Sequence, residues 1–272
     1  MDVPYINNFE CAIVIPVYKE DISADEEVSL QRCLEILREY QVIFVAPYKL
    51  NCAKYQQICA KYKMSVSCEF FKKKFFRGYN GYNTLLVCSD FYKRFLNYTY
   101  ILIYQLDAFV FENSLSFWCK QGYDYIGAPF FDLPRGAATP QHTNHLNGGL
   151  SLRKTESFYK LAKTKLHLSF FYLSSKNTLQ KKITAFNMFY LLFLLLVTRI
   201  LQIFFKVEVG EDFEWSSKIR KYGNIAPFEK ALQFSFDSCP EYAFKLNNNT
   251  LPFGCHGWTT YYNRQFWKKF NL

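Results

Sequence analysis

Short apolar runs alternate with amphipathic segments through the first part of the chain. Residues 12–18 (AIVIPVY), 42–46 and 100–104 are apolar, and runs of this length between polar loops are typical of buried strands. Residues 29–40 instead repeat apolar side chains at the spacing of one helix face. The expected order is strand 12–18, helix 29–40, strand 42–46, helix 54–62, strand 66–70, helix 83–96 and strand 100–104. This alternation predicts an α/β fold, with a mixed, mostly parallel sheet flanked by helices.

After residue 111 the pattern is less regular. We expect a helix at residues 114–121, a Gly/Pro-rich irregular stretch at 127–141, a short strand at 150–153 and a helix from Thr155. No internal repeat or low-complexity linker separates these segments from the first part. The sequence therefore predicts one domain, residues 1–272, made of two lobes at residues 1–111 and 112–272.

The segment of residues 183–205 is apolar around all helical faces in its central part and carries one charge, Arg199. One interpretation is a fully buried core helix. The other is a helix that docks on a membrane surface, because six lysines interleaved with aromatic residues precede it, as suits an anionic headgroup layer. A spanning helix needs about 20 uninterrupted apolar residues, more than this run provides. We favour docking over burial.

Composition and charge narrow the partners. The formal charge of +10 favours a negatively charged partner: a phosphorylated substrate, an anionic lipid or a nucleic acid. Nucleic acid is the weakest of the three, because the sequence has no Arg-rich arm and no nucleic-acid-binding motif. Nine cysteines without a C-x-x-C pair do not form the pattern of a disulfide framework or a zinc site. Residues 1–5 do not begin a secretory signal. These observations predict a reduced, cytoplasmic location.

Asp107 is the first candidate for chemistry. It is the one carboxylate in the apolar run of residues 101–111, where an ionised group is costly unless it is paired, hydrogen-bonded or bound to a metal. In doubly wound sheets, ligands bind beyond the carboxyl ends of the strands, where this residue is expected. The alternative is an Asp that merely caps the following turn.

Three further stretches carry unusual combinations of residues. Gly148 and Gly149 sit between a polar loop and a short strand, which permits close backbone approach to a ligand. The stretch at residues 210–215 holds three carboxylates beside two aromatic residues, either as a solvated helix start or as a partly buried acidic group. His256 lies between glycines in residues 252–258, where a lone histidine is more often structural than a ligand.

Together these stretches resemble the DUF5672-type bacterial GT-A-like glycosyltransferases, over most of the chain. The resemblance rests on six pieces: Tyr82-Asn83-x-Leu85-Leu86, Tyr104-Gln105-Leu106-Asp107, residues 122–129 (GYDYIGAP), residues 147–153 (NGGLSLR), Glu211-Asp212 and residues 254–258 (GCHGW). It implies a GT-A-like, Rossmann-related fold with an apolar helical insertion at residues 183–205. The lobe 1–111 would bind a nucleotide sugar, with a UDP-sugar favoured, and the lobe 112–272 would hold the acceptor and the catalytic groups.

The resemblance also implies a divalent metal, Mn²⁺ or Mg²⁺, on the donor diphosphate. GT-A enzymes use an Asp-x-Asp motif for it, and here Gln105 replaces the first Asp while Asp107 matches the second. His256 would supply a second protein ligand. The metal neutralises charge that develops on the leaving nucleoside diphosphate. Contacts to the donor are expected from Arg77, Asn83, Gln105, Asp107, Asn147, Gly148 and Gly149.

By the same resemblance, Asp212 would be the general base of an inverting transfer, and Glu211 would orient the acceptor hydroxyl. Trp215 and Trp258 are candidates for stacking on the acceptor. The implied acceptor is a surface glycan, lipid-linked, reached by an enzyme that is peripheral on the inner face of the cell membrane through residues 183–205.

Two other functions stay open at this point. The replacement of an Asp by Gln105 fits a non-catalytic carbohydrate- or lipid-binding protein on a degenerate transferase scaffold. A nucleotidyltransferase would carry a glycine-rich phosphate loop near the N-terminus, and residues 12–30 contain no glycine. A transferase of polysaccharide biosynthesis is therefore the leading hypothesis.

Overall fold

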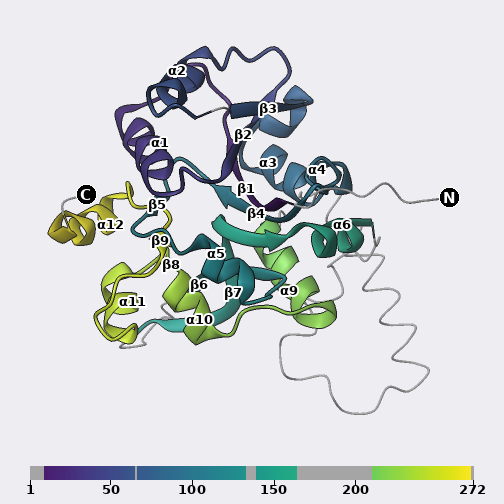
Figure 1. The fold of residues 1–272 in the computed structure, drawn as a ribbon. Helices are drawn as coiled ribbons and strands as arrows, with labels where there is room; N and C mark the ends of the chain where they lie inside the picture. The colour runs from purple at the N-terminus through teal and green to yellow at the C-terminus, as the bar shows by residue number, and fades with distance from the viewer. Residues whose placement is uncertain (1–8, 65, 133–138, 164–209, 271–272) are drawn as a thin grey trace, which may run out of the picture.

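The computed structural model describes residues 9–64, 66–132, 139–163 and 210–270. Its main sheet has six strands in the order β3-β2-β1-β4-β7-β6. They are β1 (Phe9–Pro16), β2 (Gln41–Pro47), β3 (Val66–Phe71), β4 (Tyr98–Tyr104), β6 (Tyr125–Asp132) and β7 (Gln141–Lys154). Strands β1 to β4 are parallel, whereas β7 pairs antiparallel with both β4 and β6 (Figure 1). The fold class predicted from the sequence is confirmed.

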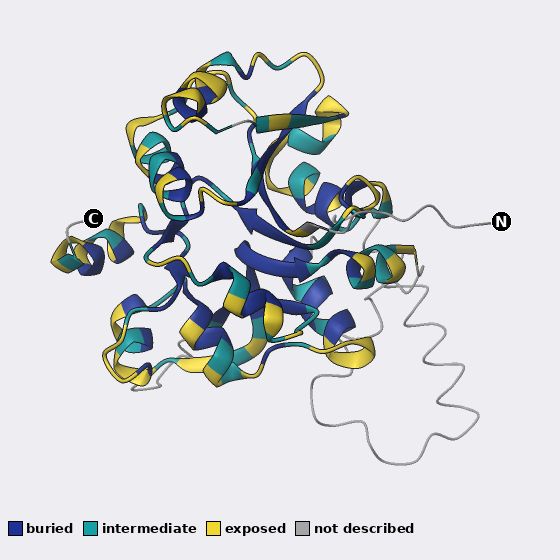
Figure 2. Cartoon of the chain, in the orientation of Figure 1, coloured by how far each residue is buried: buried dark blue, intermediate teal, exposed yellow. Residues whose placement is uncertain are grey.

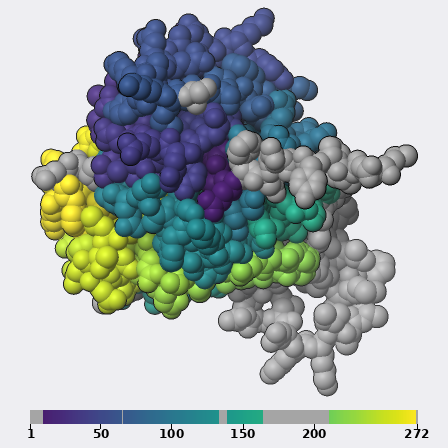
Figure 3. Space-filling model, viewed as in Figure 1, coloured from purple at the N-terminus to yellow at the C-terminus, as the bar shows by residue number. Residues whose placement is uncertain are grey.

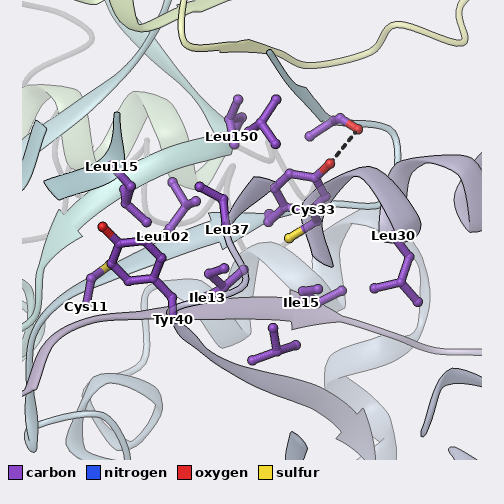
Figure 4. Packing of buried hydrophobic residues seen from close by; sticks show 14 of the residues in the cluster. Cys11, Ile13, Ile15, Leu30, Cys33, Leu37, Tyr40, Leu102, Leu115 and Leu150 are labelled. Atoms are coloured by element: carbon purple, nitrogen blue, oxygen red, sulfur yellow. Dashed lines mark hydrogen bonds between the residues drawn. The ribbon is translucent and has the colours of Figure 1, made fainter. Parts of the chain in front are cut away.

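Helices cover both faces of this sheet. They are α1 (Ala24–Ile36), α2 (Ala53–Lys61), α3 (Gly78–Leu86), α4 (Ser89–Lys93), α5 (Leu115–Lys120), α6 (Thr155–Lys163) and α9 (Glu211–Tyr222). Side chains alternate across a strand, so Ile13 and Ile15 pack with α1, α2 and α5 on one face, while Ala12 and Val14 pack with α3, α4, α6 and α9 on the other. Figure 4 shows part of the first core, and Figure 2 shows the buried strands enclosed by exposed helix surfaces.

A second, smaller sheet positions the C-terminal loop. It has the order β5-β9-β8, with β5 (Phe109–Val110), β8 (Ser235–Phe236) and β9 (Gly254–Cys255). Around it lie α10 (Phe228–Phe234), α11 (Pro240–Leu246) and α12 (Tyr261–Trp267). The N-terminal part of the chain lies at one end of the molecule and the C-terminal part at the other (Figure 3). The small sheet joins them, because β5 follows β4 directly while β8 and β9 come from the far end of the sequence.

Three local predictions differ from the structure. The helix expected at residues 83–96 is two short helices, α3 and α4. The stretch expected to be irregular contains most of β6. The pairing of β6 with β7 shifts register on both sides of Pro129, so Gly127 and Pro129 lie at irregularities within the strand and do not end it. Helix α1 begins earlier than expected, at a capping box in which Ser23 and Glu26 satisfy each other's backbone N–H groups.

The apolar segment of residues 183–205 lies outside the described residues. Among the residues that the structure does describe, no helix is long and apolar enough to cross a membrane.

Candidate functional site

A cavity of about 540 Å³ opens at the carboxyl ends of β1 and β4. These two strands are neighbours in the sheet, and the chain proceeds from β1 toward one edge and from β4 toward the other. This reversal of strand order is the topological switch point at which open α/β sheets bind ligands. The cavity wall includes Pro16 and Tyr18 after β1, Gln105 and Asp107 after β4, and Tyr79 from α3.

Four polar side chains converge beside this cavity. Nε2 of His256 lies 3.0 Å from Oε1 of Gln105 and 3.2 Å from Oδ1 of Asp107. Nδ1 of the same ring lies 2.8 Å from Oδ1 of Asp237. The structure therefore brings together the two residues predicted as metal ligands, with Gln105 beside them. Asp237 was not predicted from the sequence.

The charges in this group support each other. Burial alone would lower the pKa of His256, but attraction and hydrogen bonding to Asp107 and then Asp237 raise that pKa to about 10. Burial alone would raise the pKa of Asp107, but its attraction and hydrogen bond to His256 lower that pKa below its ordinary value. These contacts favour a protonated ring, in which both ring nitrogens donate, and an ionised Asp107.

The spacing of these atoms also fits a divalent cation. Octahedral ligands at about 2.1 Å from a hard ion are about 3.0 Å from their neighbours, close to the 3.0 and 3.2 Å that separate Nε2 of His256 from the oxygens of Gln105 and Asp107. Among the described residues, no group of three His, Cys, Asp or Glu side chains is arranged to hold a metal. An ion bound here would have two such ligands and one amide oxygen, and it would have to displace a proton on Nε2.

The glycine pair predicted to admit a ligand is filled by protein side chains. A Cβ on Gly148 would lie 2.0 Å from Oε1 of Glu211, and a Cβ on Gly149 would lie 2.0 Å from Nε2 of His256. Oδ1 of Asn147 accepts the backbone N–H of Gly149 at 2.7 Å. The two glycines thus make room for Glu211 and His256, and Asn147 holds the backbone of Gly149; donor contacts from these three residues stay a prediction.

Glu211 is bound to a buried arginine. Its two carboxylate oxygens accept from Nη1 and Nη2 of Arg153 at 3.0 and 2.8 Å, and neither side chain is appreciably exposed. A bidentate pair of this kind fixes the start of α9 against β7. Both oxygens are thus engaged, which makes Glu211 a residue that holds α9 in place; the acceptor-orienting role expected for it stays a prediction.

Asp212, the next residue, lies near Tyr79. A Cβ on Gly210 would lie 2.5 Å from Oδ1 of Asp212 and 2.7 Å from the hydroxyl of Tyr79, so both groups flank one point. Tyr79 lines the cavity. Burial, and then the charge of Glu211, raise the pKa of Asp212 to about 6. A carboxylate with that pKa accepts a proton more readily than an ordinary Asp.

A second cavity, of about 940 Å³, lies on the other side of Asp107. Asp107 lines both cavities, and Asp237 and His256 line the second. Its wall also holds Glu241, Lys245, Lys269 and the exposed ring of Tyr262. The converging side chains therefore stand where two cavities meet.

The two tryptophans predicted to stack on an acceptor are core residues. Trp215 is fully buried against Tyr92 and Phe158, and its indole N–H donates to the carbonyl of Leu86. Trp258 is 4% exposed. Neither ring offers a free face, which corrects the prediction. Other aromatic residues line the cavities: Tyr18, Phe76, Tyr79 and Tyr82 the first, and Tyr242, Tyr262 and Phe266 the second.

The two remaining predicted donor residues differ in position. Arg77 is exposed at the start of α3, between Phe76 and Gly78, which both line the first cavity. Asn83 is buried, and its Oδ1 accepts the backbone N–H of Glu211 at 3.4 Å. Arg77 can therefore reach a ligand, whereas Asn83 helps to cap α9.

The family model described as protein of unknown function (DUF5672) matches residues 65–256, well over half of the chain. The chain belongs to the DUF5672 family. The matched part of this DUF5672 protein contains Gln105, Asp107 and Asp237 and ends at His256. Comparison with curated proteins gives no match.

Solved structures show which fold this DUF5672 protein shares. The apo-form glycosyltransferase GlyE of Streptococcus pneumoniae TIGR4 has a TM-score of 0.52 at 11% identity, over 97% of this chain and 60% of that chain. Core-mannan synthase A from Aspergillus fumigatus, in its Mn/GDP form, has a TM-score of 0.40 at 11% identity, over 58% and 62% of the two chains. The first similarity shows a GT-A-like glycosyltransferase fold. The DUF5672 chain spans 60% of the length of that GlyE structure.

Proposed function

We propose that this protein transfers a sugar from a nucleotide-sugar donor to a glycan acceptor with the help of a divalent metal. The observation that carries the proposal is the convergence of Gln105, Asp107 and His256 between two cavities at the switch point of a GT-A-like sheet. A transferase of two substrates needs two adjoining binding spaces with charged groups between them. This arrangement also argues against a simple binding module, which needs only one of the spaces.

The first cavity suits the donor. Its tyrosine rings offer faces for a base or a sugar, and Asp107 and Gln105 stand at its end. Bound there by Asp107, His256 and the amide oxygen of Gln105, Mn²⁺ or Mg²⁺ would neutralise charge on the leaving diphosphate. Arg77 and the neighbouring lysines of residues 72–74 are exposed beside this cavity and add positive charge for the phosphates. A UDP-sugar is the favoured donor.

The second cavity suits the acceptor. Glu241 lies between Lys245 and Lys269, at 3.8 and 3.9 Å, and the ring of Tyr262 is exposed. Carboxylate and ammonium groups hydrogen-bond sugar hydroxyls, and an exposed tyrosine ring can stack on a sugar face. We infer a glycan acceptor, carried on a lipid if residues 183–205 dock on the membrane.

Asp212 is the proposed general base of an inverting transfer. It stands beside Tyr79, which lines the first cavity, so the acceptor hydroxyl would have to extend from the second cavity past Asp107 to reach it. Its raised pKa leaves it mostly ionised near neutral pH while still able to take a proton. Arg153 binds Glu211 and thereby fixes the first turn of α9, on which Asp212 lies. The base would thus be held on a rigid element.

A panel of nucleotide sugars incubated with the full chain and Mn²⁺ tests the proposal. We expect release of nucleoside diphosphate from one panel member, seen by ³¹P NMR, and its loss in Asp107→Asn. Asp124→Asn is the control, since Asp124 is a hydrogen-bonded carboxylate that lines neither cavity and is bonded to Ser157 and Asn224. Mn²⁺-dependent binding without any turnover would favour the non-catalytic alternative. The absence of both binding and turnover would refute the proposal.

A further inference from the structure

Asp237 contacts His256 from the side of the ring opposite Asp107. Oδ1 of Asp237 lies 2.8 Å from Nδ1, while Oδ1 of Asp107 lies 3.2 Å from Nε2. The side chains differ in exposure, at 15% for Asp237 and 41% for Asp107. Asp107 is therefore open to a ligand, whereas Asp237 mainly faces the ring that it bonds.

The small sheet places Asp237 and His256 side by side. Strands β8 and β9 are parallel, with Phe236 opposite Cys255, so the next residue on each strand is Asp237 or His256. The backbone N–H of His256 donates to the carbonyl of Phe236 at 2.8 Å. The side chain of Asn263 then donates to the carbonyls of Asp237 and Gly257, at 2.8 and 3.0 Å. The backbones beyond both strand ends are thus joined without the carboxylate of Asp237.

The other face of the ring is also fixed. A Cβ on Gly149 would lie within 2.0 to 2.6 Å of three atoms of the imidazole, so the ring lies directly against this glycine. The backbone N–H of Trp258 donates to the carbonyl of Asp107 at 3.2 Å, which ties the histidine loop to the end of β4. With the backbone held in these ways, the carboxylate of Asp237 is left to determine the rotation of the ring and the state of its Nδ1.

We propose that Asp237 is a positioning residue that accepts the Nδ1–H of His256 and so presents Nε2 to a divalent metal beside Asp107 and Gln105. The inference rests on the metal site of the proposed function. A metal-binding histidine usually donates its other ring N–H to a carboxylate or carbonyl, which fixes the tautomer and makes the ligand nitrogen more basic. Asp237 occupies that outer position. Its bond to the ring also means that the charge of this buried carboxylate is not left unpaired.

Mn²⁺ affinity, measured by electron paramagnetic resonance with Mn²⁺ as the only ligand, tests this role. Asp237→Ala should weaken binding by about 10- to 100-fold, the usual effect of losing such a partner. Asp237→Asn should lose less, because its amide oxygen still accepts the Nδ1–H. The nitrogen hyperfine signal of bound Mn²⁺ should be present in the wild type and reduced in Asp237→Ala. Asp124→Ala is the matched control, with a side chain 13% exposed.

Three results would overturn the inference. One is Mn²⁺ binding by Asp237→Ala with wild-type affinity and an unchanged nitrogen signal. Another is an equal loss of affinity in Asp237→Ala and Asp124→Ala, which would mean that any buried carboxylate matters through stability alone. The third is a wild type that binds no Mn²⁺. In that case, turnover of a nucleotide sugar would still leave the transferase proposal standing without a metal, so the two failures are distinguishable.

Discussion

Removing the carboxylate of Glu211 should destabilise the fold strongly. The guanidinium of Arg153 is fully buried, and all five of its N–H donors are used. They donate to Oγ of Ser151, to the hydroxyl of Tyr92, to the carbonyl of Gly148 and to both oxygens of Glu211. In Glu211→Ala, two N–H donors of Arg153 lose their acceptors and the buried positive charge of Arg153 loses its counter-charge.

The expected size follows from that burial. Breaking a buried ion pair by removing one partner costs about 3–5 kcal/mol, which for a chain of this length lowers the Tm by roughly 6–20 °C. By contrast, the exposed pair Lys160–Glu156, with side chains 69% and 64% exposed, should contribute less than about 1 kcal/mol. Glu156→Ala is therefore the matched control.

Urea unfolding followed by circular dichroism measures these differences. Arg153→Met combined with Glu211→Leu should be more stable than Glu211→Ala, because no charge is then left buried alone. If Glu211→Ala loses no more stability than Glu156→Ala, or if the losses at positions 153 and 211 simply add, the two side chains are not coupled as the structure indicates.

Further outcomes are expected at Gly149, at Asp212 and at residues 183–205. Gly149→Ala should displace the ring of His256 and weaken Mn²⁺ binding while leaving far-ultraviolet circular dichroism unchanged; wild-type affinity would show that the ring does not need this space. Asp212→Asn should lower turnover by about 100-fold or more at constant donor affinity, and wild-type turnover should fall as pH drops through about 6, where Asp212 becomes protonated. Because the folded pKa of Asp212 is raised, stability is lost as the pH rises from the ordinary Asp pKa through about 6, and it stays lower at pH 7. Asp212→Asn should therefore be at least as stable as wild type at pH 7. A less stable variant would contradict the assigned burial. Finally, the chain should co-sediment with anionic liposomes, and replacing three leucines of residues 183–205 by serine should release it; a wild type that stays in the supernatant would refute membrane docking.

The site was predictable from the sequence where a residue carried its own local signal. A single carboxylate after an apolar strand made Asp107 a candidate, whereas the place of His256 beside it was implied only by the family resemblance. Asp237 had no such signal, because its contact with His256 depends on the parallel pairing of β8 and β9 and not on neighbouring residues. Contacts of this kind arise only from the tertiary fold.

Glycines and tryptophans were predictable in part. The pair Gly148 and Gly149 correctly indicated a close approach, but sequence alone did not show that Glu211 and His256 make it. Trp215 was chosen because tryptophan stacks well on sugars, yet it shares the buried face of α9 with Ile219, four residues later. The helical spacing of Trp215 and Ile219 therefore indicated burial, but the prediction relied on residue type instead.

Calorimetric titration of nucleotide sugars into the full chain, with and without Mn²⁺, tests the central claim most directly. The account predicts binding of one donor that requires Mn²⁺ and is lost in Asp107→Asn and in His256→Ala, while Asp124→Asn binds as the wild type does. Mn²⁺-dependent binding that persists undiminished in both variants, or a folded wild type that binds no nucleotide sugar, would contradict it.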